Sequence, residues 1–526
     1  MNSYNIELAF PFHAFAKNHH KSKPDFSASF PGKTLTTRDI QQSKWEKVSF
    51  MMEVKPEKSQ NPFSPNRAGQ THQDTIIQIA RNARCLLLAH GYLAAFVVGI
   101  YGEDAHIARF DHSSCVVSPS FNIRTRPEVL QQFFWHFTHP KLSGPVVGFD
   151  PTVRPLEPED KAWVKRWLEE LEEEVTDFNT DIRYCRRVQV FDEKTHAMSS
   201  WIMYRPVDIN ARLFSRATTV WRAIEDTRVP DADAGGLIDL PDAPKPRLRI
   251  LKESWRQVVR KSEASFYHRL SERIPEDERI GLTKLECGGD LGQWEVRQWE
   301  QSSPNVSCMD GQRDLRLSPG PRPSTPRSPS PSPSDTTLSS DGGSTSPAPP
   351  TPEPFPIPYP QHQTFSWTIT RGSEFTYRER SHMRFVVADV GRPLTKAKNS
   401  RELVAAFRDA IEGVFLDPLP KHLRDLTDIF LPGHRLACVK GGVLHRDVSV
   451  GNILIVDKPE RARFKGFIHD FDYSSMEEDL PDLLEDSGDP DDPLCDDDED
   501  VWSGDESETT KNKVDPRQKE RTVSTP

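Results

Sequence analysis

Hydrophobic positions in the first third of the chain follow helix and strand periods in turn. Apolar residues recur at helical spacing through residues 74–91, which predicts an amphipathic helix. Segments with the apolar pattern of strands follow at 92–101, 106–110 and 114–117. Helical spacing returns at 129–137 and 158–178. We therefore expect a compact α+β module at residues 76–185, after an irregular polar segment at residues 1–75.

The middle of the chain is richer in strand-like sequence. Strand patterns run through 186–224 and appear again at 248–251, 365–369 and 383–390. Residues 254–270 carry apolar side chains at helical spacing, among them Trp255, Val259 and Phe266. A further amphipathic helix is expected at 402–412. This order predicts a second region of mixed α and β structure.

Composition separates the packed part of the chain from two segments that we expect to be disordered. Only 35% of the 526 residues are hydrophobic and 45 are proline, so part of the chain should remain unpacked. Residues 303–360 are dominated by Ser, Pro and Thr, and they cannot bury enough apolar surface to offset the entropy of ordering. Residues 476–526 are expected to form an acidic, disordered tail.

The net charge of −11 comes from that tail. Residues 476–508 hold seventeen acidic residues and no Lys or Arg, so the rest of the chain is net positive. Because the acidic charge is local, it does not indicate a general nucleic-acid binder, and we expect no nucleic-acid partner.

Cysteine usage and the apolar segments favour an intracellular, soluble protein. The seven cysteines are scattered singly, without a Cys-x-x-Cys pair, which indicates free thiols in a reducing compartment. The N-terminus lacks a basic segment followed by an apolar one. The most apolar segment, 92–101, is too short to span a bilayer, so we expect no membrane partner.

Residues 443–455 combine a His-Arg-Asp triplet with an asparagine and a strand. His445, Arg446 and Asp447 form the triplet. Asn452 follows five residues later and precedes Ile-Leu-Ile. Phosphoryl transfer from ATP needs a carboxylate near the acceptor hydroxyl and oxygen ligands for magnesium, roles that fit Asp447 and Asn452. The triplet alone is weak; the asparagine spacing and the strand make the motif specific, and a surface loop without chemistry is the alternative.

A second acidic position stands eighteen residues after Asn452. Asp470 ends an apolar strand in the sequence Phe-Ile-His-Asp-Phe-Asp, from where its carboxylate can hold magnesium against phosphates. Aspartate at a strand end is commonly only a turn former, so its position after the first motif carries the argument. Asp472 stands where most kinases have glycine.

A lysine and a glutamate upstream form the third candidate pair. Strand alternation places Lys252 on the same face as Leu248 and Ile250. Glu263 lies on the apolar face of the helix expected at 254–270, where a carboxylate needs a partner. A Lys252–Glu263 pair would orient the lysine toward ATP phosphates. The alternative is that Lys252 extends to solvent and Glu263 lies at the edge of the helix face.

The segment before that strand is the candidate phosphate-covering loop. Residues 213–221 read Leu-Phe-Ser-Arg-Ala-Thr-Thr-Val-Trp and contain no glycine. Small residues let the backbone approach a phosphate, but less freely than glycine does. An ordinary hairpin is the alternative interpretation.

With these motifs placed, the chain resembles the fungal-type protein kinase family of mushroom-forming fungi, over about residues 75–475 and again at 521–526. The resemblance rests on Ile-Ala-Arg-Phe-Asp at 107–111, Gly-Phe-Asp-Pro at 148–151, Ile-Leu-Lys-Glu-Ser-Trp at 250–255, Val-Gly-Arg-Pro-Leu at 390–394, the motif at 445–452 and Asp-Phe-Asp at 470–472. The Asp-Phe-Asp variant and Ser449, in place of the usual lysine, are features of that family.

The resemblance implies an α+β, bilobal protein-kinase-like fold behind a family-specific N-terminal module. The first part of the N-terminal lobe would occupy 186–302, and the rest of that lobe, the hinge and the catalytic loop would occupy 361–475. The C-terminal lobe would be truncated, because the family continues past the activation segment. Residues 414–433 would interrupt a helix that leads to the catalytic loop, as a retained intron would.

The resemblance also implies roles for particular residues, with ATP and Mg²⁺ as cofactors. These roles fall on Asp447 as catalytic base with His445 and Arg446 in its motif, on Asn452 and Asp470 as magnesium ligands, and on Lys252, Glu263, Asp389 and Gly391 as nucleotide contacts. The function expected is transfer of a phosphoryl group to a Ser/Thr hydroxyl of a protein substrate, impaired in this chain by the truncated lobe. A non-catalytic pseudokinase and a small-molecule kinase are the alternatives.

Overall fold

The computed structural model describes only part of the 526-residue chain. The described residues are 24–34, 36, 45–64, 69–140, 144–173, 185–230, 236–240, 243–302, 361–365, 379–411, 433–457 and 463–476. All of them belong to one of the two units of the chain, residues 1–477. The expected disordered insertion at 303–360 lies outside them, as does nearly all of the acidic tail, so both stay predictions. No helix in the described ranges has the length and apolar character needed to cross a membrane.

A six-stranded sheet is built from the N-terminal part of the chain. Its strands are β1 (Phe26–Ser29), β2 (Val48–Lys55), β3 (Ala95–Tyr101), β4 (Asp104–Phe110), β5 (Cys115–Val117) and β6 (Phe121–Asn122). They follow the order β1-β2-β3-β4-β5, with β6 beside β4. The pairing of β2 with β3 is parallel, and the other pairings are antiparallel. The helix α2 (Gln70–His90) connects the two parallel strands, as a parallel connection requires.

The core of this sheet is aromatic on the face that meets α3 (Pro127–Thr138). Alternation along the strands places Phe50 and Phe96 on one face, and the Phe133 ring lies 5.8 Å from Phe50 and 5.9 Å from Phe96. From α2, Ile79 and Leu86 enter the same core. The helices and strands expected between residues 74 and 137 are therefore confirmed, with small shifts at their ends.

The expectation that residues 1–75 are irregular is wrong, because β1 and β2 lie within them. β2 reads Val-Ser-Phe-Met-Met-Glu-Val-Lys and is buried in the sheet, with Met51 fully inaccessible. The strand is isolated among polar residues, and it is stabilised by pairing with β3, more than forty positions away. Local sequence carries little trace of such a long-range pairing.

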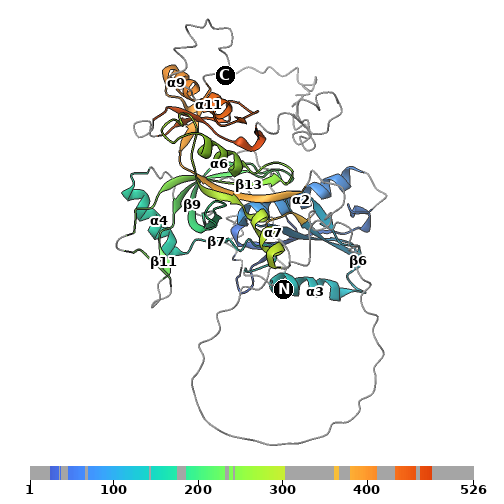
Figure 1. The fold of residues 1–526 in the computed structure, drawn as a ribbon. Helices are drawn as coiled ribbons and strands as arrows, with labels where there is room; N and C mark the ends of the chain where they lie inside the picture. Colours follow the sequence, from blue (N-terminus) through green and yellow to red (C-terminus); the bar gives the residue numbers. More distant parts are fainter. Residues whose placement is uncertain are drawn as a thin grey trace, which may run out of the picture. The chain divides into compact units, whose positions relative to one another are not determined.

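A seven-stranded antiparallel sheet follows (Figure 1). Its strands are β7 (Val153–Pro155), β8 (Arg186–Phe191), β9 (Met198–Ile209), β10 (Thr219–Glu225), β13 (Leu248–Gln257), β14 (Leu285–Asp290) and β15 (Arg380–Val387). Their order is β14-β15-β13-β10-β9-β8-β7. The sheet curls so that β14 also approaches β8, and Glu193 donates a backbone hydrogen bond to Gly288 across this gap. β11 (Val229–Pro230) and β12 (Leu237–Ile238) form a separate hairpin.

Alternating residues of β9 serve two different cores. Trp201 and Met203 lie in the core enclosed by the curled sheet. Ile202 and Tyr204 pack on the other side with Trp163 of α4 (Pro158–Glu170). Because successive side chains of a strand point to opposite faces, both faces of this sheet are covered. The part of α4 that was expected beyond residue 173 lies outside the described residues.

The helix expected at 254–270 begins later than predicted. β13 continues to Gln257, where it pairs with Arg380, and the helix is α6 (Glu263–Arg273). Trp255 therefore lies on a strand, with its ring stacked on His382 of β15 at 4.8 Å, and Val259 is exposed. The pairing with β15 outweighs the helical spacing in this segment.

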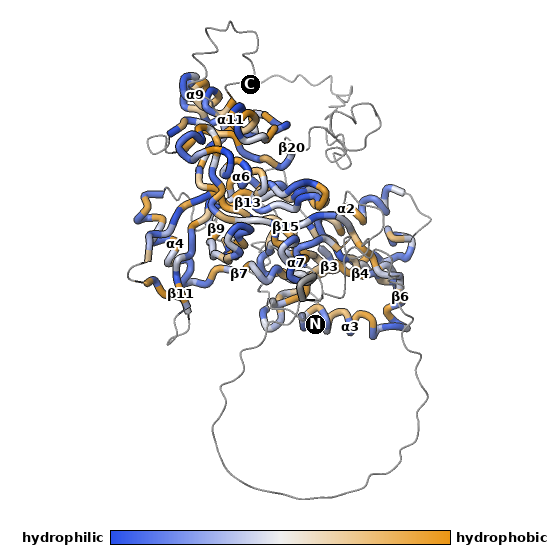
Figure 2. Tube along the Cα trace, viewed as in Figure 1, coloured by the Kyte–Doolittle hydropathy of each residue, from blue (hydrophilic) through white to orange (hydrophobic). Residues whose placement is uncertain are grey.

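The last described elements follow β15 in the chain, and several of them pack against α6. They are β16 (Gly391–Pro393), η4 (Leu394–Lys396), α9 (Ser400–Ile411), α11 (Gly433–Val439), β17 (Val443–Leu444), β18 (Ile453–Val456), β19 (Gly466–Ile468), η5 (Phe471–Tyr473) and β20 (Ser475–Met476). One core joins Phe266, Phe385, Leu436 and Phe471, and so ties α6 and β15 to α11 and η5. Figure 2 shows the alternation of hydrophilic and hydrophobic residues along α9, which packs on β18 and β19.

The two ends of the undescribed segment 412–432 lie next to each other. A Cβ atom on Gly281 would stand 1.9 Å from the carbonyl oxygen of Asp409 and 2.9 Å from the nitrogen of Gly433. A Cβ atom on Gly433 would stand 3.2 Å from the oxygen of Ala410. The helices α9 and α11 are therefore neighbours. The interruption expected at 414–433 lies outside the described residues except for Gly433, which begins α11.

Candidate functional site

Lys252 lies in the middle of β13, between β10 and β15. It pairs with Val220 on one side and with Phe385 on the other. Its side chain is only 8% exposed, and its ammonium lies 5.7 Å from the Phe385 ring centroid. A buried ammonium group needs charged partners, because burial alone disfavours its charged form.

Three carboxylates surround that ammonium. The Lys252 Nζ atom lies 2.6 Å from Glu263 Oε2, 2.8 Å from Asp470 Oδ1 and 3.5 Å from Asp472 Oδ2. Burial lowers the pKa of Lys252, but the carboxylates outweigh it and hold the pKa well above its ordinary value. The structure thus brings together the lysine and glutamate that the sequence paired, and it adds the acidic residue that follows β19.

Glu263 is the first residue of α6, and its carboxylate is completely buried. Besides Lys252, it accepts hydrogen bonds from the Phe471 backbone at 3.2 Å and from the Tyr267 hydroxyl at 3.3 Å. Burial and the neighbouring Asp472 raise the pKa of Glu263. The helix start therefore links the lysine of β13 to the Asp-Phe-Asp segment.

A second cation enters the cluster from the turn between β9 and β10. The Arg216 Nη1 atom donates to Asp472 Oδ2 at 2.6 Å. Lys252 and Arg216 together offset the burial of Asp470 and hold its pKa well below its ordinary value. His469 adds no charge, because burial lowers its pKa to about 4.

Carboxyl groups outnumber cations in this cluster. Three carboxylates, those of Glu263, Asp470 and Asp472, face two cations, Lys252 and Arg216. The three carboxylates offer oxygen atoms within 4.8 Å of one another. Clustered carboxylate oxygens are ligands that suit a hard divalent cation such as Mg²⁺.

The His-Arg-Asp motif forms a tightly connected loop between β17 and β18. His445 is fully buried; its Nε2 donates to the His469 carbonyl at 2.9 Å, and its ring packs edge-on against Phe471 at 4.7 Å. Burial lowers the pKa of His445, so the ring is neutral. Arg446 is exposed and adopts a left-handed backbone with φ of 62°. His445 therefore fastens the motif to the segment that carries Asp470.

Asn452 and Asp447 are held together inside this loop. The Asn452 amide nitrogen donates to Asp447 Oδ2 at 2.8 Å and to the Asp447 backbone oxygen at 3.0 Å. The Asn452 backbone oxygen accepts from the nitrogen of His469 at 3.0 Å. The side-chain nitrogen of Asn452 is thus occupied, and its amide oxygen is the atom suited to bind a cation. His469, which pairs with the Asn452 backbone, directly precedes Asp470.

Asp389 and Gly391 are not part of the Lys252 cluster. Asp389 follows β15 and is half-buried; burial raises its pKa, and neighbouring Thr283 and Lys284 partly offset this. Gly391 pairs with Val456, and a Cβ atom there would stand 2.6 Å from the Cβ of Leu454. Both lie on the segment that leaves β15, and their expected contact with the adenine stays a prediction.

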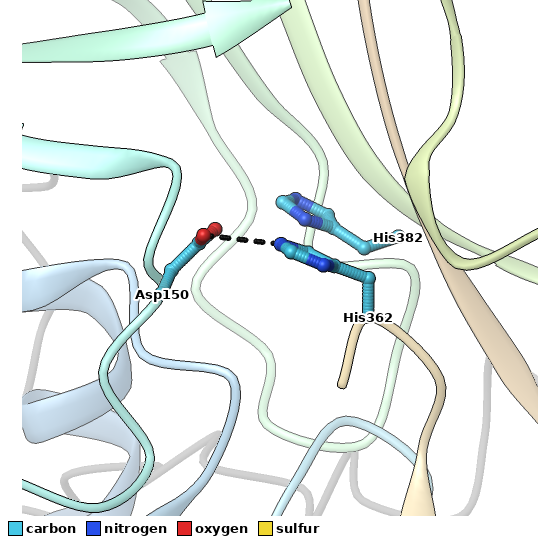
Figure 3. Close-up of side chains that lie close together, drawn as sticks. All are labelled: Asp150, His362 and His382. Atoms are coloured by element: carbon cyan, nitrogen blue, oxygen red, sulfur yellow. Dashed lines mark hydrogen bonds and ion pairs between the residues drawn. The ribbon is translucent and has the colours of Figure 1, made fainter. Parts of the chain in front are cut away.

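A separate buried charge cluster surrounds His362, and Figure 3 shows this side chain with Asp150 and His382. His362 Nε2 lies 3.0 Å from Asp150 Oδ1, and His362 Nδ1 lies 2.7 Å from Glu295 Oε1. Arg384 reaches Asp150 at 3.3 Å and Glu253 at 2.7 Å. Burial disfavours the charged ring, but the two carboxylates raise the pKa of His362 to about 10.

Asp150, His362 and His382 also form a group whose side-chain types could hold a metal ion. Both nitrogens of His362 already lie at hydrogen-bond distance from carboxylates, so the ring bridges them as an imidazolium. The His382 ring is stacked parallel to it, at 5.7 Å, and burial lowers the pKa of His382 to about 3. The geometry fits a proton better than a metal ion.

Sequence reasoning missed Arg216, Asp472 and the His362 cluster as parts of charge networks. The available signals were a cation in the glycine-free loop and a carboxylate at the usual glycine position. Their pairing joins residues 256 positions apart, and that of His362 with Asp150 joins residues 212 apart. No local pattern encodes such contacts.

Comparison with protein-family models gives a match to most of the chain. The family model of fungal protein kinases matches residues 29–416 and 421–483. The match begins earlier than the resemblance at 75–475 and does not include 521–526. No curated protein and no solved structure matches the chain. Because the family match covers most of its length, the chain belongs to the fungal protein kinase family.

Proposed function

We propose that this chain transfers a phosphoryl group from Mg²⁺-bound ATP to a serine or threonine hydroxyl of a protein. The observation that carries the proposal is the meeting of Lys252, Glu263 and Asp470 at one ammonium, with distances of 2.6 and 2.8 Å. They come from β13, from the start of α6, eleven residues after Lys252, and from the segment that follows β19, 218 residues after Lys252. Family membership supports kinase chemistry in general.

The residues divide the work by position. Lys252, oriented by Glu263, would contact the phosphates, and Asp470 with the Asn452 amide oxygen would hold Mg²⁺, which neutralises phosphate charge. Asp447 would accept the proton of the acceptor hydroxyl. Its carboxylate is held by Asn452 at 2.8 Å, which supports a fixed orientation. The seven-stranded sheet with α6 would be the N-terminal lobe, and the elements from β16 onward the start of the second lobe.

Titration of a fluorescent ATP analogue, with and without Mg²⁺, tests the proposal. Wild type should bind more tightly with Mg²⁺, and Asp470→Asn should lose that difference. Lys252→Ala should bind the analogue more weakly, because its contact with the phosphates is lost. Lys245→Ala is the control for this variant, because Lys245 is exposed and pairs with Glu170 on the surface. Equal affinity in all conditions would rule out this assignment.

A non-catalytic binding function is the second candidate. It is favoured by the glycine-free turn before β10, because such a turn approaches phosphates less freely. ATP binding without phosphate incorporation into any protein or small-molecule acceptor would support it. Incorporation into a small molecule alone would instead support a small-molecule kinase, to which Ser449 in place of lysine points.

A further inference from the structure

The turn between β9 and β10 presents a charged side chain where a phosphate-covering loop would present backbone. Residues 210–218 contain no glycine, and Arg216 of this turn donates to Asp472 Oδ2 at 2.6 Å. The backbone oxygen of Arg216 accepts from Trp255 at 2.7 Å, which fixes the turn to the end of β13. Hydrogen bonds thus hold both the backbone of Arg216 and its guanidinium group.

An aromatic ring supports the guanidinium. Arg216 lies 4.7 Å from the Tyr473 ring centroid, and Arg260 lies 4.6 Å from the same ring. Stacking of this kind holds the planar guanidinium in one orientation. Arg216 is also the most exposed member of the cluster, at 29%, against 8% for Lys252 and 6% for Asp472. Solvent therefore reaches the cluster mainly at Arg216, while Lys252 and Asp472 are buried.

Arg216 and Lys252 converge on the same carboxylate oxygen. Asp472 Oδ2 lies 2.6 Å from the arginine and 3.5 Å from the lysine. An anion held between a guanidinium and an ammonium occupies the position that a phosphate group would take between two such cations. Asp472 thus fills, with one negative charge, a place where a more highly charged group would bind more strongly.

We propose that Arg216 is a phosphate-binding residue for the nucleotide, replacing the backbone amides of a glycine-rich loop, and that Asp472 holds its guanidinium in place until the phosphate chain takes over. The inference rests on the proposed function, since it names a further contact of the same nucleotide. The guanidinium fork binds phosphate oxygens in pairs, which an ammonium cannot do. Asp472 also keeps the buried Lys252 paired when no nucleotide is bound.

Binding of ATP, ADP and adenosine to the full chain in Mg²⁺ buffer tests this inference. Arg216→Ala should weaken ATP and ADP binding about ten- to hundredfold, the effect of losing a hydrogen bond between charged groups. Adenosine binding should not change, and Arg216→Lys should recover only part of the loss. Arg212→Ala, in the same exposed turn and without an ion pair in the described structure, is the matched control.

A second variant separates phosphate binding from a purely structural lock. In Mg²⁺-free buffer, Asp472→Asn should tighten ATP binding, because it removes the internal competitor for Arg216. If Arg216→Ala leaves ATP affinity unchanged, or weakens ATP and adenosine equally, the inference is wrong. If Lys252→Ala loses ATP while Arg216→Ala does not, only this inference fails. If the wild type binds no ATP, the proposed function fails with it.

Discussion

The chain contains two buried charge clusters that differ in balance and exposure. Around His362, the carboxylates of Asp150, Glu295 and Glu253 face the imidazolium, Arg384 and the nearby Arg186. Asp150 and Arg384 are fully inaccessible. Around Lys252, three carboxylates face only two cations, and Asp470 and Arg216 are 23% and 29% exposed.

The difference separates a structural bridge from a candidate site. A balanced and inaccessible cluster has no charge to offer and no route for a ligand, so its value is to join segments. An accessible cluster in which carboxyl groups outnumber cations can take a cation and exchange partners. Residue type does not make this distinction, because both clusters contain groups that could hold a metal ion.

The largest effect is expected from loss of the carboxylate that we propose as the catalytic base. Asp447→Asn should lower phosphate incorporation into a generic protein substrate at least about 100-fold, because the base that accepts the hydroxyl proton is lost. Its melting temperature should stay near that of the wild type, since asparagine keeps the shape of the side chain. Asp104→Asn, in a surface pair with Lys58, should retain activity. Undiminished turnover by Asp447→Asn would show that Asp447 is not the catalytic base.

Removal of the bridging ring should act on stability instead. His362→Ala leaves the buried Asp150 and Glu295 without their shared partner, and breaking a buried pair costs about 3–5 kcal/mol. Chemical denaturation measures this change, with His139→Ala as the exposed control. The affinity of the folded fraction for ATP should be unchanged. A small loss of stability would show that the cluster rearranges around the gap.

The charge on His362 should make stability depend on pH. Its pKa is raised to about 10 in the fold, above the ordinary value of 6.5, so the folded state holds the proton more tightly. The stabilisation is complete below pH 6.5 and is lost as pH rises toward 10, on the order of a few kcal/mol. Unfolding free energy of wild type and His362→Gln, measured from pH 6.5 to 9.5, should converge. Parallel curves would contradict a protonated ring.

The smallest effect should appear at the open cluster. Mg²⁺ should raise the melting temperature of the wild type slightly, because binding to the folded state stabilises it by RT ln(1 + [L]/Kd), where [L] is the free Mg²⁺ concentration. Lys252→Met should show a larger increase, since three carboxylates are then left facing Arg216 alone. Asp470→Asn should show a smaller one. Identical increases in all three proteins would place Mg²⁺ elsewhere.

Sequence patterns predicted the helices and strands whose hydrophobic residues recur at a regular local spacing. The helix α2 and the strands β3 and β4 follow from their hydrophobic periods, and the Lys252–Glu263 contact follows from the need of a buried carboxylate for a partner. Predictions failed where pairing with a distant segment determines whether a strand forms or how far it extends. β2 exists through β3, and β13 extends past residue 254 through β15.

The candidate site shows the same limit. The motif around Asp447 and Asn452 is contiguous in sequence, and its internal hydrogen bonds span five residues. The pairs that complete the cluster span more than two hundred residues, from Lys252 to Asp470 and from Arg216 to Asp472. Charge at such positions is visible in a sequence, but its partner depends on how the sheet and the strand ends come together.

The meeting of Ala410 and Gly433 beside Gly281 bears on how freely this part of the chain can change in length. A segment whose two ends already touch closes a loop, and the entropy of closing a loop grows only with the logarithm of its length. A change in the number of residues between positions 411 and 433 should therefore leave the two helix ends and the loop of the His-Arg-Asp motif in place. This junction is therefore a convenient one at which to graft a reporter domain.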